Sequence, residues 1–92
     1  MNIQLTQTSA PQVNQVALPE PLTYYCDLYR HLVCRPYSIA NLHLMAQRLG
    51  VKRCWFHEDR YDIPKRRLVE VMGKCQTVGA RDIMAICRNP YV

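Results

Sequence analysis

Residues 38–50, SIANLHLMAQRLG, hold the clearest structural pattern in the chain. Apolar side chains recur there at helical spacing, at Ile39, Leu42, Met45, Ala46 and Leu49. This period is typical of an amphipathic helix that buries one face. Ser38 stands where a helix N-cap is preferred, and Gly50 stands where the chain can take the left-handed conformation that ends many helices. The pattern therefore predicts a helix between these two residues.

On the N-terminal side of this helix, residues 23–35 are rich in side chains that favour β-strands, such as Tyr24, Tyr25 and Val33. We expect one or two strands in this segment, with a break near residues 27–30. Pro36 biases the residue before it towards extended geometry, so the segment does not form a long helix.

On the C-terminal side, residues 51–56, VKRCWF, predict a further strand, and residues 57–63 predict a loop. Pro64 is suited to the first turn of a second helix, with residue 62 or 63 as its cap. We expect that helix to end at residue 71 or 72, before Gly73. A short extended piece at residues 77–78 and a last helix over residues 80–88 follow, and the side chains expected to point inward are Ile83, Met84, Ile86 and Cys87.

This order of elements predicts an α+β fold, a single compact domain in which a small antiparallel or mixed sheet packs with two to three helices. A chain of 92 residues is long enough for one domain with a modest core. We place the domain at residues 22–92. Residues 1–21, the leader, contain four Gln and three Pro. We expect the leader to be flexible or extended, with the option of adding an edge strand.

The charge of the chain is unevenly distributed. Residues 1–29 hold two acids and no Lys or Arg, whereas residues 30–92 hold all 12 basic residues and five acids, which leaves them at +7. Nine of the basic residues are Arg, whose planar donor group suits phosphate, RNA and carboxylate partners. A small domain with this balance favours an anionic partner.

The five cysteines are odd in number and include no Cys-x-x-Cys spacing. The first residues do not read as a secretory signal, and no window approaches the length of a membrane span. We therefore expect free, mostly buried thiols and a reducing, cytoplasmic location, without a membrane partner.

Residues 55–67, WFHEDRYDIPKRR, carry the most candidate binding groups. The predicted partner- or RNA-binding residues are Arg60, Lys65, Arg66 and Arg67, with His57, Tyr61, Lys52 and Arg48 as neighbours. Basic side chains would contact phosphates, and aromatic rings would stack on bases. The alternative is a solvated helix face, in which Arg66 or Arg67 pairs with Asp62 or Glu70. Trp55 and Phe56 are also candidates for the core, and Tyr61 for a structural hydrogen bond through its hydroxyl.

Catalytic and metal-binding signals are weaker. Cys54-x-x-His57 is half of a zinc-site spacing, and the other cysteines are scattered. His57, Glu58, Asp59 and Asp62 are the residues that a metal-dependent nuclease would use. No phosphate-cradling Gly loop or His-Glu-x-x-His motif accompanies them. We therefore expect a protein that is not an enzyme and that has no metal, cofactor or small-molecule substrate.

Several short motifs together resemble a known family. They are Leu49-Gly50-Val51, Arg53-x-Trp55-Phe56-His57, Tyr61-Asp62-Ile63, Lys65-Arg66, Gly79-Ala80 and Arg81-Asp82. The pattern over residues 23–88 is similar to a small domain of unknown function found in bacteria and their phages. That family tends to have His at position 60, where this chain has Arg60, and this departure weakens a paired-histidine site with His57. The resemblance carries no catalytic role to any residue.

The phage association of the family leads to a narrower expectation. A very small, basic phage protein resembles anti-CRISPR proteins, in particular inhibitors of the type I-F surveillance complex, which share no common motif. The resemblance implies stoichiometric binding to Cas subunits and guide RNA in the host cytoplasm, so that target DNA is not engaged. The alternatives are a small basic nucleic-acid-binding accessory protein and, less favoured, a metal-dependent nuclease.

Overall fold

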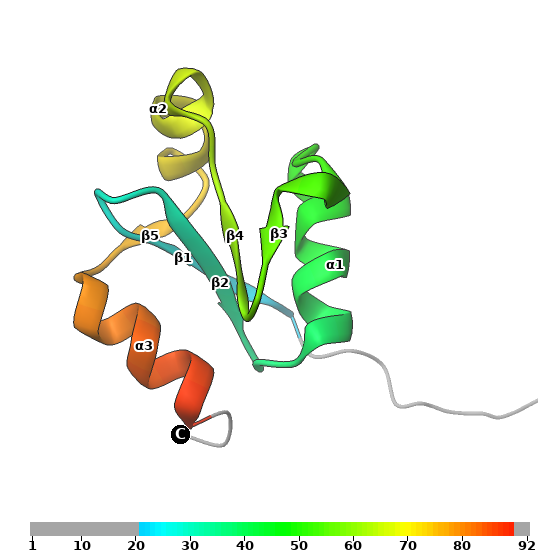
Figure 1. Cartoon of the computed structure of the whole chain (residues 1–92), viewed down its shortest axis with the longest axis vertical. Coiled ribbons are helices and arrows are strands. Elements are labelled where there is room, and N and C mark those ends of the chain that lie inside the picture. Colours follow the sequence, from blue (N-terminus) through cyan, green and yellow to red (C-terminus); the bar gives the residue numbers. More distant parts are fainter. Residues whose placement is uncertain (1–20, 90–92) are drawn as a thin grey trace, which may run out of the picture.

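Five short strands form one mixed sheet, and three α-helices pack on it, in the computed structural model, which describes residues 21–89 (Figure 1). The elements are β1 (Thr23–Cys26), β2 (His31–Arg35), α1 (Ile39–Leu49), β3 (Phe56–His57), β4 (Arg60–Asp62), α2 (Leu68–Met72), β5 (Gln76–Thr77) and α3 (Ala80–Arg88). Short 3-10 turns, η2 (Arg53–Trp55) and η3 (Lys65–Arg67), precede β3 and α2. The α+β prediction is confirmed, whereas the prediction for the leader falls almost entirely outside the described residues.

The strand order in the sheet is β3-β4-β2-β1-β5. β1 and β2 pair antiparallel, β4 adds antiparallel to β2, and β3 adds antiparallel to β4. β5 runs parallel to β1, with Cys26 opposite Thr77. The predicted break between two strands at residues 27–30 is therefore confirmed, and it is the β1–β2 turn.

The helices cover both faces of the sheet. Leu32 and Tyr61 are paired residues of β2 and β4, and the Tyr61 hydroxyl lies 2.8 Å from Nδ1 of His43 in α1. Side chains alternate along a strand, so His31 and Arg60 point to the opposite face, where they share a cavity with side chains of α3. Figure 1 shows α1 and α3 well apart, with the strands between them.

The helix α1 follows the sequence pattern closely. The Ser38 side chain accepts a hydrogen bond from the Asn41 main-chain N–H at 3.0 Å, and Gly50 caps the other end with a φ of 68°. The buried residues are Leu42, Met45, Ala46 and Leu49. Ile39, which was expected on the same stripe, is 45% exposed, because the buried stripe begins one turn later in the helix.

Two predictions for residues 51–63 are wrong. Residues 53–55 form the 3-10 turn η2, so only Phe56 of the expected strand 51–56 is in a strand. The expected loop 57–63 contains a hairpin, in which His57 pairs with Arg60 and Glu58 and Asp59 form the turn. Glu58 adopts a φ of 58°, a conformation usually taken by Gly or Asn. Neither Gly nor Asn occupies this turn, so the usual sequence signal for a hairpin turn is missing.

The last two helices largely match their predictions. α2 ends at Met72, before Gly73, as expected, but Pro64 has extended geometry at the N-cap of η3 and does not lie in the first turn of a helix. α3 spans the predicted residues, and its buried side chains are Ile83 and Ile86. Met84 was expected inward but is 49% exposed, because it lies about 100° around the helix from its neighbour Ile83. No helix within the described residues is both long and apolar enough to cross a bilayer.

Candidate functional site

The half-buried indole of Trp55 lies among three cationic side chains from two separate segments. The Lys52 ammonium and the Arg66 guanidinium carbon each lie 5.8 Å from the ring centroid, and the Arg67 guanidinium carbon lies 6.0 Å away. We call these four residues the Trp55 face. Contacts of this length between a cation and an aromatic ring are attractive and stabilise the arrangement.

The two segments of the Trp55 face are joined by Arg67. Its guanidinium donates to the main-chain oxygens of Gly50 and Leu49 at 3.0 and 3.3 Å, at the end of α1. It also donates to both carboxylate oxygens of Glu70 at 2.7 and 2.9 Å, and this bond lowers the pKa of Glu70. Arg67 therefore acts as a clamp between η3 and α1, with its donors largely used within the domain.

The other cations of the region remain open to a partner. Within residues 21–89, neither Lys52 nor Arg66 has an ion pair with a carboxylate. Lys65 is exposed in η3, and Arg48 is exposed in the last turn of α1. Of the predicted binding residues, these four have exposed charges, and Lys52 and Arg66 share the indole ring of Trp55.

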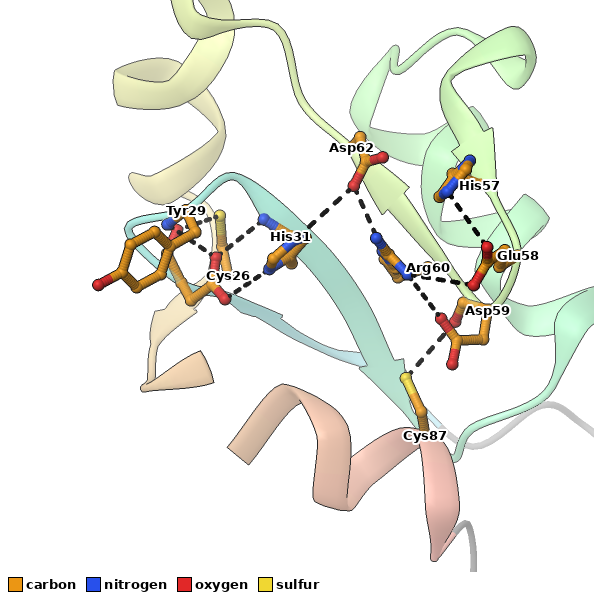
Figure 2. A network of polar contacts seen from close by, with 10 residues as sticks. Cys26, Tyr29, His31, His57, Glu58, Asp59, Arg60, Asp62 and Cys87 are labelled. Atoms are coloured by element: carbon orange, nitrogen blue, oxygen red, sulfur yellow. Dashed lines mark hydrogen bonds and ion pairs between the residues drawn. The ribbon is translucent and has the colours of Figure 1, made fainter. Parts of the chain in front are cut away.

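Arg60 lies apart from the Trp55 face, on the side of the sheet that faces α3 (Figure 2). Its Nε lies 3.4 Å from Asp62, and one terminal nitrogen lies 3.3 Å from Asp59 and 3.8 Å from Glu58. The carboxylates of Asp59 and Asp62 raise the pKa of Arg60 against the opposing effect of its burial. His57, half exposed, lies 3.5 Å from Glu58 in the same group. The predicted binding residues therefore lie at two separate sites, with Arg60 and His57 at one and the Trp55 face at the other.

Tyr61 is completely buried, so its ring is not available to stack on a base. Its edge-to-face contacts are with Phe56 and His43, at centroid distances of 5.5 and 5.9 Å. Tyr61 therefore belongs to the core, with its hydroxyl satisfied by His43, which is the structural alternative that the sequence had left open. Phe56 likewise packs against His43 of α1, at a centroid distance of 4.8 Å.

Asp27 and His31 form a further polar pair, which was not predicted from the sequence. Asp27 is 1% exposed and accepts hydrogen bonds from the main-chain N–H groups of Tyr29 and His31, both at 2.9 Å. Its second oxygen lies 2.8 Å from Nδ1 of His31, and the other ring nitrogen faces Asp62 at 4.0 Å (Figure 2). An Asp at the end of a strand with a His four residues later is a local signal that would have indicated this pair.

Metal-binding geometry is not found in the part of the chain that the structure describes, where no three His, Cys, Asp or Glu side chains are arranged to hold an ion. The thiols are free: Cys26 and Cys34 are buried, Cys75 and Cys87 are half-buried, and Cys54 is exposed. The expectation of unpaired cysteines is therefore confirmed for all five, whereas full burial holds only for Cys26 and Cys34.

Comparison with known proteins identifies a family but no activity. The family described as "Protein of unknown function (DUF4031)" matches residues 19–89, which include every strand and helix described above. No curated protein and no solved structure matches the chain. Because the match covers most of the chain, the protein belongs to the DUF4031 family, whose function is unknown.

Proposed function

We propose that this protein is a non-enzymatic binding protein whose Trp55 face contacts RNA carried by a protein partner. The observation that carries the proposal is the position of Lys52 and Arg66, each 5.8 Å from the Trp55 ring centroid and each without an ion-pair partner among the described residues. Two free cations beside one aromatic ring offer an anionic partner both charge and a flat surface.

RNA fits this pair of features better than an acidic protein surface does. Single-stranded RNA presents phosphates to Lys and Arg and unstacked bases to aromatic rings and guanidinium planes. A carboxylate-rich protein would use the cations but leave the indole without a matching group. Lys65 and Arg48 extend the exposed positive charge along η3 and the end of α1.

In its narrowest form, the proposal makes the protein a phage-encoded inhibitor of a host CRISPR-Cas ribonucleoprotein. It would bind Cas subunits and guide RNA with fixed stoichiometry and prevent engagement of target DNA in the host cytoplasm. Support for the RNA is the Trp55 face, whereas support for this partner is the small size and basic charge of the chain. Arg60 is left out of the contact surface, because three carboxylates lie within 3.8 Å of its guanidinium.

The test is co-purification of the full chain with a type I-F surveillance complex, followed by a target-DNA binding assay. The double variant Lys52→Gln, Arg66→Gln should lose binding and inhibition. The matched control Lys74→Gln, Arg81→Gln removes the same charge from two exposed positions outside the Trp55 face and should retain both. If the wild-type chain neither co-purifies with the complex nor blocks its DNA binding, the inhibitor proposal fails.

The alternative is a small basic accessory protein that binds free nucleic acid. The cations Lys52 and Arg66 beside Trp55 favour this alternative, because exposed positive charge is sufficient for binding to phosphates. A salt titration separates the two functions. Affinity based on phosphate contacts falls steeply with salt, whereas affinity for a protein-bound RNA retains the part supplied by protein–protein contacts.

A further inference from the structure

A cavity with a volume of about 300 Å³ lies between α3 and the sheet face that carries His31 and Arg60. One wall is polar and is formed by His31, Asp59 and Arg60. The other wall belongs to α3 and includes Ile83 and Met84. Ligand sites commonly combine an apolar wall with a few converging polar groups, in volumes from about 300 Å³ upwards. The cavity shares no residue with the Trp55 face.

The polar wall is held in place by contacts from other elements. The Tyr37 hydroxyl donates to the main-chain oxygen of Asp59 at 2.8 Å, and the Cys87 thiol donates to the same oxygen at 3.5 Å. Burial raises the pKa of Tyr37 to about 12, so its hydroxyl keeps its proton at neutral pH. Asp27 holds the His31 ring through Nδ1. Figure 2 shows Asp59 and Arg60 side by side, with Cys87 below them and His31 across the sheet.

The charges on this wall favour a neutral group at Arg60 and Asp59. Arg60 is balanced by Asp59 and Asp62, at 3.3 and 3.4 Å, so it has no surplus positive charge to hold a phosphate. What it does offer, beside the Asp59 carboxylate, is a hydrogen-bond donor next to an acceptor. A neutral group with a donor and an acceptor on one edge matches both, and a flat group fits against the apolar wall.

We propose that this cavity binds a guanine base. The N1 and N2 hydrogens of guanine are donors suited to the Asp59 carboxylate, and its O6 and N7 atoms are acceptors that arginine commonly contacts. The ring face would pack on Met84, whose thioether makes favourable contacts with aromatic rings. Arg88, exposed on the same cavity, supplies a cation for the phosphate attached to the base.

Guanine reaches the cavity either in a free nucleotide or as an unpaired base in RNA. The chemistry of recognition is the same in both cases. The proposal goes beyond the binding of RNA by the Trp55 face and does not depend on it, because the residues are different. A variant of one site should therefore leave the other site unchanged.

The experiment is an NMR titration of the full chain with GMP, AMP and UMP, and with two short RNAs, A-A-G-A-A and A-A-A-A-A. We expect guanine compounds to shift the signals of His31 and Arg60 and to bind at least about tenfold more tightly than their adenine counterparts, a difference within the range of one good two-bonded base contact. A response to GMP identifies free nucleotides as a source, and a response to the guanine RNA alone identifies RNA.

Variants connect the response to the cavity. Met84→Asp should abolish it, and Asp59→Asn should weaken it by about tenfold, the loss expected for one base contact. Val69→Asp is the matched control, because Val69 is 85% exposed on α2 and does not line the cavity. The proposal is overturned if neither guanine compound shifts these signals, if adenine compounds bind equally well, or if Met84→Asp behaves like Val69→Asp.

Discussion

Nδ1 of His31 lies 2.8 Å from Oδ2 of Asp27, and this contact joins the turn between β1 and β2 to the cavity beneath α3. The contact orients the ring so that its other nitrogen, Nε2, faces the Asp62 carboxylate at 4.0 Å. The same carboxylate accepts two main-chain N–H groups within the turn. One buried side chain therefore determines both the backbone of the turn and the orientation of a cavity residue.

Replacing Asp27 by Ala should destabilise the fold strongly. The substitution removes a buried carboxylate and leaves two part-buried main-chain N–H groups and the His31 ring without their acceptor. We expect a loss of about 2–4 kcal/mol in the free energy of unfolding, measured by urea denaturation. The control Asp62→Ala removes a half-exposed carboxylate from the same network and should cost less than about 1 kcal/mol. Equal losses in the two variants would contradict the assigned role of Asp27.

Replacing Arg67 by Met should loosen the contact between η3 and the end of α1. The variant loses the donors to Leu49 and Gly50 but retains most of the aliphatic packing. We expect a lower free energy of unfolding and a red shift of the Trp55 fluorescence as the indole becomes more exposed. Lys65→Met is the control, and it should leave the emission maximum unchanged because Lys65 is exposed.

The imidazole of His43 should titrate below its ordinary range. Burial lowers the pKa of His43 from 6.5, and the charge of Arg53 lowers it further. The folded state therefore binds this proton less readily than the unfolded state, so the contribution of His43 to stability is present above pH 6.5 and is lost as the pH falls below it. An NMR titration of the ring measures the pKa directly.

The effect of Arg53 on His43 can be tested separately. Arg53→Gln should raise the pKa of His43 towards 6.5, because the charge of Arg53 is one of the two causes that lower this pKa. Arg48→Gln removes the same charge from the last turn of α1 and should leave the titration of His43 unchanged. A similar shift in both variants would show that the overall charge of the domain, and not Arg53, lowers the pKa.

The five thiols should differ sharply in reactivity. Burial raises the pKa of Cys26 and Cys34 to about 12 and that of Cys75 to about 11, so these thiols carry almost no thiolate at neutral pH. Cys54 is exposed. Alkylation of the folded chain at about pH 8, followed by mass spectrometry, should therefore modify Cys54 first. Modification of Cys26 at the same rate in the folded state, with denatured protein as the reference, would contradict this prediction.

Elements with a local signal could be predicted from the sequence. The helix α1 has its apolar period, Ser38 and Gly50 within thirteen consecutive residues, and the bounds of α3 and the end of α2 at Met72 were likewise anticipated. The hairpin of β3 and β4 was missed, because Glu58-Asp59 lacks the glycine that usually signals a two-residue hairpin turn and because Tyr61 is the only buried side chain of β4. Its pairing with β2 depends on residues thirty positions away.

The candidate sites likewise have some features that are visible in the sequence and others that depend on contacts between distant residues. The sequence by itself determined the basic balance, the α+β class and the density of charge around residues 55–67. Tertiary structure alone decided that Arg60 pairs with Asp59 and Asp62, and that Lys52 and Arg66 meet at Trp55. The physical reason is that strand pairing and helix docking are non-local. They bring together side chains whose spacing along the chain contains no pattern, as in the cavity between β2, β4 and α3.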